Sequence, residues 1–298
     1  MRVIRRSKKN PKVSLILLDW NCRESFHIFD YLKNQTVQKD DFEIIWIEYY
    51  DRKPSELVKK EIDTWIIMDM PNDLYYHKHL MYNIGICFAK GEVVVIMDSD
   101  VMVKPTFIES IIKEFKKNDS IVLHLDEFRN INPKYYPFNY LSFEEFETDG
   151  CKNCSDGVTT GIRNRYDPIH NLNYGACFCA KRDDLIEIGG ADEHIDYLGH
   201  ICGPYEMTFR LENFGRTVKW SKEEFLYHTW HPGSDGIGNY MGPHDGKNVS
   251  LRALDLLDNG RIEPYVENKA IKKLKDSKQN LDLLLSNVSK NWSINILG

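Results

Sequence analysis

The feature that most constrains the fold is an apolar run from Val93 to Met97 followed by two carboxylates, Asp98 and Asp100. The run is unbroken and rich in β-branched side chains, which is typical of a strand covered on both faces in a parallel sheet. Ligands of open α/β sheets bind outside the carboxyl ends of the strands, so the two acids stand where a site is expected. Hard anionic oxygens at such an edge predict a divalent cation, which in turn suits a diphosphate.

The residues around the two carboxylates favour a ligand site over a solvated turn, which an isolated Asp-x-Asp also fits. Pro105 and an expected amphipathic helix from Thr106 follow them, and Asn83 and the turn Ala89-Lys90-Gly91-Glu92 precede the strand. This order resembles the family 2 glycosyltransferases of the GT-A fold, in which an Asn and an Ala-Lys-Gly-Glu-like turn lead into an apolar strand ending in Asp-x-Asp. The resemblance implies an α/β fold, with a Rossmann-like, mostly parallel central sheet flanked by helices and a helical C-terminal extension.

The resemblance also implies how the chain is divided. We expect a basic N-terminal tail at residues 1–12, a GT-A domain at 13–245 and the helical extension at 246–298. Within the domain, the nucleotide-binding half is expected at about 13–125 and the acceptor half at about 126–245. A chain of 298 residues is long enough for one such domain with its own core.

The bulk properties exclude some classes of partner. A formal net charge of −6 argues against nucleic acid. No apolar stretch approaches the roughly 18–20 residues of a membrane span, and the N-terminus lacks an apolar signal core, so the sequence predicts a cytoplasmic protein. The six basic residues among residues 1–12 fit either a solvated tail or peripheral contact with the anionic inner face of a membrane.

Four residues of the first half are expected to contact the nucleotide. Val13 to Leu18 predicts a buried strand that ends at Asp19, where the family has a polar loop touching the nucleotide. A second predicted strand ends at Glu48, which matches an acidic residue that accepts a hydrogen bond from a uracil-like base. Asn83 and Lys78 lie on a predicted helix at the front of the pocket, with Lys78 supplying the cationic contact. The identity of the nucleotide base stays open, because Glu48 and Tyr49 stand where the family usually has a pair of Asp residues.

The acceptor half contains a second resemblance. Gly189-Gly190-Ala191-Asp192-Glu193 looks like the "GG-x-DE" segment before the catalytic helix, and its paired glycines permit a tight loop. Aligned on Arg210, the usual Glu-Asp pair falls on Gly203 and Pro204, which leaves Glu206 as the surviving acid. Inverting transfer needs a carboxylate beside the acceptor hydroxyl, so Glu206 is the expected base, and a structural ion pair with a nearby Arg is the alternative. The other acids considered for this role are Asp192, Glu193 and Asp196.

A late histidine pair completes the predicted metal site. His228 and His231 flank Trp230, and the apolar residues before His228 predict a strand that this histidine follows. Several enzymes of the GT-A fold close the metal shell with a His from this segment. The resemblance therefore implies Mn²⁺ or Mg²⁺ held by Asp98, Asp100, His228 and His231, with His231 contacting phosphate as the alternative.

The remaining segments have broader predictions. The glycine-rich stretch 233–246 predicts a mobile lid over the donor, and the charged segment 264–292 predicts helix that packs on the domain, forms a homodimer or meets a membrane. An odd number of cysteines without a secretory signal predicts reduced thiols, with zinc as the alternative. The cysteines considered for zinc are Cys151, Cys154, Cys177, Cys179 and Cys202.

Together these residues predict a metal-dependent glycosyltransferase. The donor is expected to be a nucleoside-diphosphate sugar, the acceptor a hydroxyl group of a glycan, a lipid-linked molecule or another compound, and the transfer inverting. The alternatives are a retaining transferase or nucleotide-sugar hydrolase on the same scaffold, and a non-catalytic module that binds glycan or nucleotide.

Overall fold

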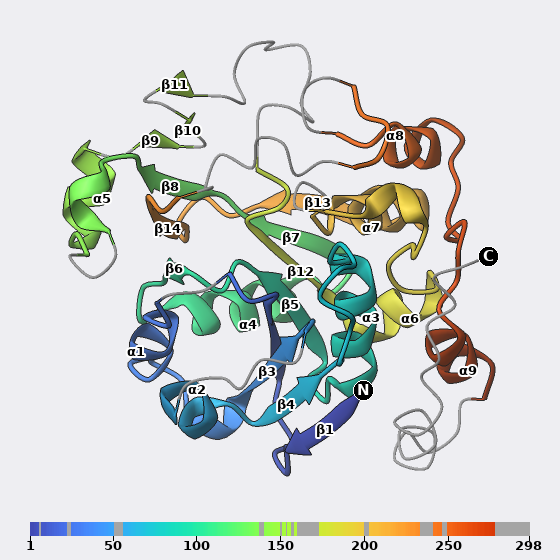
Figure 1. The fold of residues 1–298 in the computed structure, drawn as a ribbon, viewed down its shortest axis with the longest axis horizontal. Helices are drawn as coiled ribbons and strands as arrows, with labels where there is room; N and C mark the ends of the chain where they lie inside the picture. Colours follow the sequence, from blue (N-terminus) through green and yellow to red (C-terminus); the bar gives the residue numbers. More distant parts are fainter. Residues whose placement is uncertain are drawn as a thin grey trace.

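The computed structural model describes residues 1–5, 7–22, 25–50, 56–136, 140–149, 151–152, 154–155, 158–159, 173–199, 203–232, 241–245 and 249–277. Its centre is an eight-stranded mixed sheet in the order β1-β4-β3-β2-β5-β12-β7-β13 (Figure 1). The strands of this sheet are β1 (Arg2–Arg5), β2 (Val13–Asp19), β3 (Phe42–Glu48), β4 (Thr64–Ile67), β5 (Val93–Met97), β7 (Ile121–Leu125), β12 (Cys177–Lys181) and β13 (Thr217–Trp220).

Strand direction places several carboxyl ends at one edge of the sheet. Strands β2, β3, β4 and β5 run parallel, and β12 lies antiparallel between β5 and β7. Cys177, the first residue of β12, pairs with both Met97 and Leu125, so the chain leaves β5 and β7 on the two sides of the start of β12. The predicted strand at 93–97 is confirmed, and the acids that follow it stand at this carboxyl edge.

Helices cover both faces of the sheet because its strands are apolar on both sides. In β2, Ile16 and Leu18 join one core cluster while Leu15 and Leu17 join the other. Helices α3, α6, α7 and α9 contribute to the first cluster, and α1, α2 and α4 to the second. The helices are α1 (Ile28–Leu32), α2 (Glu56–Glu61), α3 (Lys78–Phe88), α4 (Phe107–Lys117), α5 (Phe143–Asp149), α6 (Arg182–Glu187), α7 (Tyr205–Asn213), α8 (Leu251–Asp258) and α9 (Lys269–Ser277).

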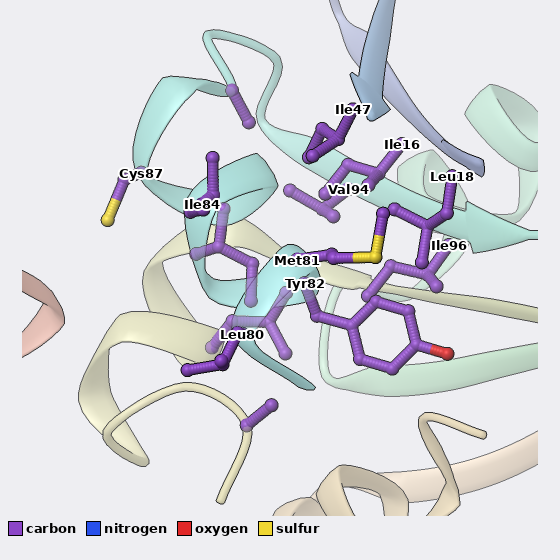
Figure 2. Packing of buried hydrophobic residues seen from close by; sticks show 14 of the residues in the cluster. Ile16, Leu18, Ile47, Leu80, Met81, Tyr82, Ile84, Cys87, Val94 and Ile96 are labelled. Carbon is purple, nitrogen blue, oxygen red and sulfur yellow. The ribbon is translucent and has the colours of Figure 1, made fainter. Parts of the chain in front are cut away.

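Helix α3 packs closely on the sheet and is buried along its whole length. A Cβ at Gly85 would lie 2.5 Å from Cδ1 of Ile16, so only glycine permits this approach of α3 to β2. Figure 2 shows the apolar contacts of this layer, with Met81 reaching toward Leu18 and Ile96. The tight packing fixes the position of Lys78 at the first turn of α3 relative to the carboxyl edge.

A second, four-stranded sheet lies beyond the carboxyl edge of β5 and β7 (Figure 1). Its order is β6-β14-β8-β9, with β14 antiparallel to β6 and parallel to β8. Its strands are β6 (Val101–Met102), β8 (Glu127–Asn130), β9 (Cys151–Lys152) and β14 (Leu226–Thr229), and a separate hairpin joins β10 (Cys154–Ser155) and β11 (Val158–Thr159). Because β6 and β8 continue directly from the carboxyl ends of β5 and β7, this sheet extends the site region away from the core.

The structure corrects some of the expected boundaries. The predicted N-terminal tail contains β1, which pairs antiparallel with β4 and forms one edge of the sheet. His228 lies inside β14 instead of following a strand, because β14 continues to Thr229. Of the predicted helix at 264–292, the structure describes α9, which contacts α3 and α6, preceded by the non-helical residues 264–268. Residues 278–292 lie outside the described residues, as does most of the predicted lid. None of the described helices has the length and apolar content needed to cross a membrane.

Gly190 gives a test of how α3 is joined to the acceptor half. Its φ is +73°, and a Cβ there would collide with Oδ1 of Asn83. We expect Gly190→Ala to lower the free energy of unfolding by about 2–4 kcal/mol, from the left-handed backbone and the disturbed hydrogen bonds of Asn83. The control, Gly260→Ala, shares the positive φ but meets nothing within 4 Å, and should cost about 1–2 kcal/mol. Equal costs in urea denaturation would contradict the proposed contact.

Candidate functional site

The turn between β5 and β6 presents Asp98 and Asp100 at the carboxyl edge of the main sheet. The backbone N–H of Asp98 donates to the carbonyl of Ala176 at 3.2 Å, and the hydroxyl of Ser99 donates to the carbonyl of Leu18 at 2.7 Å. Burial, and next the neighbouring charge of Asp100, raise the pKa of Asp98, while the cation of Lys78 opposes the shift. A bound cation would offset the repulsion between these two carboxylates in a poorly solvated turn.

Three ligand-type side chains converge next to this turn. Nε2 of His231 lies 3.0 Å from Oδ2 of Asp100, and Nε2 of His228 lies 3.7 Å from Oδ1. One ligand atom from each of the three residues falls within 4.8 Å of the others. A carboxylate with two imidazoles is a mixed oxygen and nitrogen set that fits Mn²⁺, so these residues fit the predicted metal. Asp98 lies outside this group of three and acts on it through its charge.

Strand pairing explains why residues 128 positions apart meet, from Asp100 to His228. Directly after Asp100 the chain enters β6, where Val101 pairs with His228 and Met102 with Tyr227. The ring of Tyr227 is buried in a small aromatic cluster, stacked on Phe128 at 5.7 Å, and its hydroxyl donates to Glu147 at 2.6 Å. The register of β14 against β6 therefore brings His228 to the metal position.

Three of the four predicted nucleotide residues also gather at this edge. Asp19 and Glu48 are direct partners in the parallel pairing of β2 with β3. Both are buried, with Asp19 accepting from the backbone of Cys22 at 3.0 Å and Glu48 accepting from the indole of Trp46 at 2.6 Å. Lys78 points its ammonium over the ring of Trp20 at 5.0 Å and acts on the charge of Asp98. The structure thus groups two acidic residues and a cation along one edge, where the nucleotide contacts were predicted.

Asn83, the fourth predicted nucleotide residue, lies in the connection between α3 and the acceptor half. Its amide N–H groups donate to the carbonyl of Ala191 at 2.8 Å and to Glu193 at 2.9 Å, and its oxygen accepts from the N–H of Ala191 at 2.7 Å. Burial raises the pKa of Glu193 to about 7, although hydrogen bonds from Asn83 and Asn268 oppose the shift. Through these contacts Asn83 connects α3 to the loop that contains Ala191 and Glu193.

Glu206 forms a buried ion pair with Arg210. This structural role is the alternative to catalysis that the sequence left open. Arg210 donates to its two carboxylate oxygens at 2.7 and 3.0 Å, and the N–H of Asp192 adds a third bond at 3.0 Å. Glu206 and Arg210 are both fully buried, and Arg210 also donates to the carbonyl of Ile188 at 2.7 Å. Because none of its surface is exposed, Glu206 offers no oxygen to an acceptor hydroxyl in this structure.

The three other acids considered as bases also have structural partners. Asp192 is fully buried and accepts from the backbone N–H groups of Tyr265 and Val266, which ties the segment before α9 to the acceptor half. Burial and the charge of Glu206 raise its pKa. Asp196 forms an ion pair with Arg252 on α8 at 2.6 Å, and Glu193 holds Asn83 and Asn268. The described acceptor half therefore uses all four acids as internal connections.

Two residues that the sequence did not single out add charge beside the metal position. Arg129 pairs in register with His228 on the parallel strands β8 and β14, and its guanidinium donates to the buried Glu127 at 2.5 Å. Burial disfavours the charged form of Arg129, but the charges of Glu127, Asp98 and Asp100 together hold its pKa above the usual value. The signal was present in the sequence, since Glu127 and Arg129 flank the apolar Phe128 shortly after the residues of β7.

A cavity of about 100 Å³ opens beside Asp100 and His231. Aromatic and hydroxyl side chains form most of its wall. The lining residues are Cys22, Ser25, His27, Asp100, Tyr136, Tyr140, Thr229, Trp230, His231 and Pro232. Cys177 and Cys179, which were considered for the alternative zinc site, lie in the apolar core. Cys202 lies outside the described residues.

Comparisons with known proteins give a family match over most of the chain. The sequence profile of the glycosyltransferase like family 2 matches residues 14–242, which is most of the chain. No curated protein sequence matches significantly.

Solved structures show the same fold at low sequence identity. S. aureus TarS 1–349 in complex with UDP-GlcNAc matches with a TM-score of 0.55 and 14% identity, over 95% of this chain and 77% of that one. Mannosyltransferase PcManGT from Pyrobaculum calidifontis, in complex with GDP-Man and Mn²⁺, matches with a TM-score of 0.51 and 12% identity, over 97% and 78% of the two chains. A further S. aureus TarS 1–349 structure matches with a TM-score of 0.51 and 14% identity, over 73% of this chain. In that match this chain spans 60% of the relative, less than two thirds of its length.

The buried ion pair predicts a structural effect for substitution of Glu206. In Glu206→Gln the cation of Arg210 stays buried without its carboxylate, so the free energy of unfolding should fall by about 3–5 kcal/mol. The control Glu212→Gln changes an exposed acid on the same helix and should stay within about 0.5 kcal/mol. Urea denaturation measures both. A Glu206→Gln protein as stable as the wild type but without turnover would restore Glu206 as the proton acceptor.

The three-ligand cluster predicts how Mn²⁺ binding responds to loss of one imidazole. His231→Ala should weaken Mn²⁺ binding to the protein without donor by at least about 10-fold, measured by titration calorimetry. His244→Ala, which removes an exposed imidazole outside the cluster, serves as the control and should leave the affinity unchanged. Wild-type affinity in His231→Ala would show that the ion is held elsewhere.

Proposed function

The chain belongs to the glycosyltransferase like family 2, and from this premise we propose that it transfers a sugar from a nucleoside diphosphate to a hydroxyl group, with inversion and with a divalent cation. The observation that supports this most directly is the grouping of Asp100, His228 and His231 at the edge where Asp19, Glu48 and Lys78 also gather. That edge is where open α/β sheets bind nucleotides.

The donor is proposed to lie along the carboxyl edge of β2, β3 and β5. Glu48 stands where it can accept a hydrogen bond from the base, and its parallel neighbour Asp19 lies beside it. The relatives of this fold were solved with UDP, UDP-GlcNAc and GDP-Man, so a uracil or guanine nucleotide is the proposed donor class. Both bases carry the N–H group that a carboxylate recognises.

The diphosphate is proposed to lie between two cations of the chain. Lys78 at the start of α3 favours the charged form of Asp98, and the charge of Asp98 in turn raises the pKa of Arg129 on β8, so both cations lie near this turn. Their positive charges orient the phosphates and hold the leaving group. A Mn²⁺ or Mg²⁺ ion held by Asp100, His228 and His231, with Asp98 close by, would neutralise the negative charge that develops on the departing diphosphate.

Replacing Asp100 tests the proposal. Asp100→Asn should lower the release of UDP from UDP-GlcNAc, or of GDP from GDP-Man, by about 100-fold or more, because a group that stabilises developing charge is lost. The control Asp258→Asn removes an exposed acid on α8 and should keep the wild-type rate. The assay is run with each donor, with Mn²⁺ and with a chelator. Full activity in Asp100→Asn, or activity that survives the chelator, would contradict a metal-dependent transfer at this site.

Product stereochemistry separates the alternatives. NMR of the transferred sugar should show inversion at the anomeric carbon, and retention would favour the retaining alternative. Nucleotide binding without any release of UDP or GDP by the wild-type protein would favour a binding module.

A further inference from the structure

The cavity and Lys78, the proposed phosphate contact, lie toward opposite faces of the main sheet. Asp19 and Glu48 face the side of the cavity, since Leu17 and Trp46, two residues before them, belong to the core cluster of that side. Trp20 and the helix that carries Lys78 pack against the core cluster of the α3 face. The cavity residues Ser25 and His27 precede α1, whose apolar side chains belong to the cluster of the other face. The two regions meet at Asp100, which both lines the cavity and belongs to the metal cluster. A molecule in the cavity thus approaches Asp100 from the side opposite Lys78.

This approach suits inversion, which requires attack on the face of the sugar opposite the leaving group. A diphosphate held near Lys78 departs on the α3 side, so the attacking oxygen must come from the other side. The cavity shares Asp100 and His231 with the metal cluster, so its inner end lies beside the proposed metal position. This position supports an acceptor, rather than the donor sugar, as the occupant of the cavity.

The walls of the cavity have the composition of a carbohydrate site. The rings of Tyr136 and Trp230 lie 5.8 Å apart and nearly perpendicular, so they form two sides of a corner. Tyr140 stacks on His27 at 4.2 Å and forms another flat surface. Sugar rings pack their C–H faces on aromatic rings while their hydroxyls need polar partners, which Ser25 and Thr229 supply. A volume of about 100 Å³ admits one end of an acceptor, with the rest of a longer chain outside.

The cavity also contains a hydrogen-bonded chain that ends at an imidazole. The hydroxyl of Ser25 lies 2.9 Å from Nδ1 of His27 and is also hydrogen-bonded to the hydroxyl of Tyr140. In the tautomer with its proton on Nε2, His27 accepts from Ser25 and Ser25 accepts from Tyr140. The chain is thus oriented to move a proton from the cavity to His27.

The described acceptor helix offers no alternative group for this proton. At the positions of the family's usual Glu-Asp pair stand Gly203 and Pro204, which carry no acid, and Glu206 is buried against Arg210. A transfer that releases the proton of the acceptor hydroxyl needs a base within hydrogen-bond reach or one relay away. Ser25 and His27 provide such a base beside the metal cluster.

We propose that the cavity binds the hydroxyl-bearing end of a carbohydrate acceptor and that His27 takes its proton through Ser25. This inference rests on the proposed glycosyl transfer. The acceptor oxygen forms a bond to the anomeric carbon as the bond from that carbon to the phosphate oxygen breaks, and the bonding electrons leave with the diphosphate. The acceptor proton passes to Oγ of Ser25 while the proton of Ser25 passes to Nδ1 of His27, which later releases it to water.

Binding of simple glycosides tests the occupant without metal or donor. The probes are the methyl glycosides of glucose, galactose, mannose and N-acetylglucosamine, observed by saturation-transfer NMR with the metal-free protein. At least one should receive saturation from the wild type and lose it in Trp230→Ala, while the control Tyr75→Ala, which removes an exposed aromatic ring outside the cavity, keeps it. No transfer to any of the four, or equal transfer in Trp230→Ala, would overturn the carbohydrate assignment.

The proton path is tested with the glycoside that binds, used as acceptor. Ser25→Ala and His27→Gln should lower kcat by about 10²–10⁴-fold with the KM of the donor unchanged, since general base catalysis has this magnitude. Ser120→Ala, which removes an exposed hydroxyl outside the cavity, should keep the wild-type kcat. Binding of UDP with Mn²⁺, measured by calorimetry, should be the same in all four proteins.

Each contrary result has a distinct meaning. Wild-type kcat in Ser25→Ala and His27→Gln would overturn the proton path. A raised donor KM at constant kcat would overturn the acceptor assignment and make the cavity a donor subsite. Failure of the wild type to release UDP or GDP from any donor would refute the proposed function, while the glycoside NMR would still decide what the cavity binds.

Discussion

The pairing of β6 with β14 is the contact on which the candidate site depends. It joins the turn after β5 to a strand more than a hundred residues later, and its register places His228 next to Asp100. The aromatic cluster around Tyr227 stabilises this register, because a shift by one residue would move Tyr227 out of the apolar cluster and His228 into it. The same strand pairs with β8, so Arg129 and Glu127 are carried to the site by the same small sheet.

A buried polar network supports the other side of the site. Glu206 and Arg210 on α7 bind the loop of Gly190 and Asp192, and Asn83 fastens that loop to α3. Since α3 also carries Lys78, this network fixes the proposed phosphate contact relative to the acceptor half. The acids that sequence reasoning considered for catalysis thus act in the folded chain mainly as connections between α3, α7 and the C-terminal segment.

Particular residues show which features of the fold and the site could be predicted from the sequence. The apolar strand ending at Asp98, the helix carrying Lys78 and the glycine pair at 189–190 follow local rules of periodicity and turn geometry, and the structure confirms them. The metal cluster was predicted from a family resemblance, and the structure brings three of its four residues together. The cavity of Ser25, Tyr140 and Trp230 was missed, because its residues come from four separate segments and no local pattern connects them.

The sequence by itself determined the sheet, its helical layers and the acidic edge at Asp98 and Asp100, since buried strands and carboxylates reveal themselves through composition and spacing. Only the tertiary structure decided whether a given acid meets solvent or an arginine. Glu206 had the right residue type and the right spacing for a base, yet the fold places it opposite Arg210 with no exposed surface. The physical reason is that the residue type alone fixes which side chains are acids. The burial and the partners of an acid depend instead on residues that the fold brings together from distant parts of the chain.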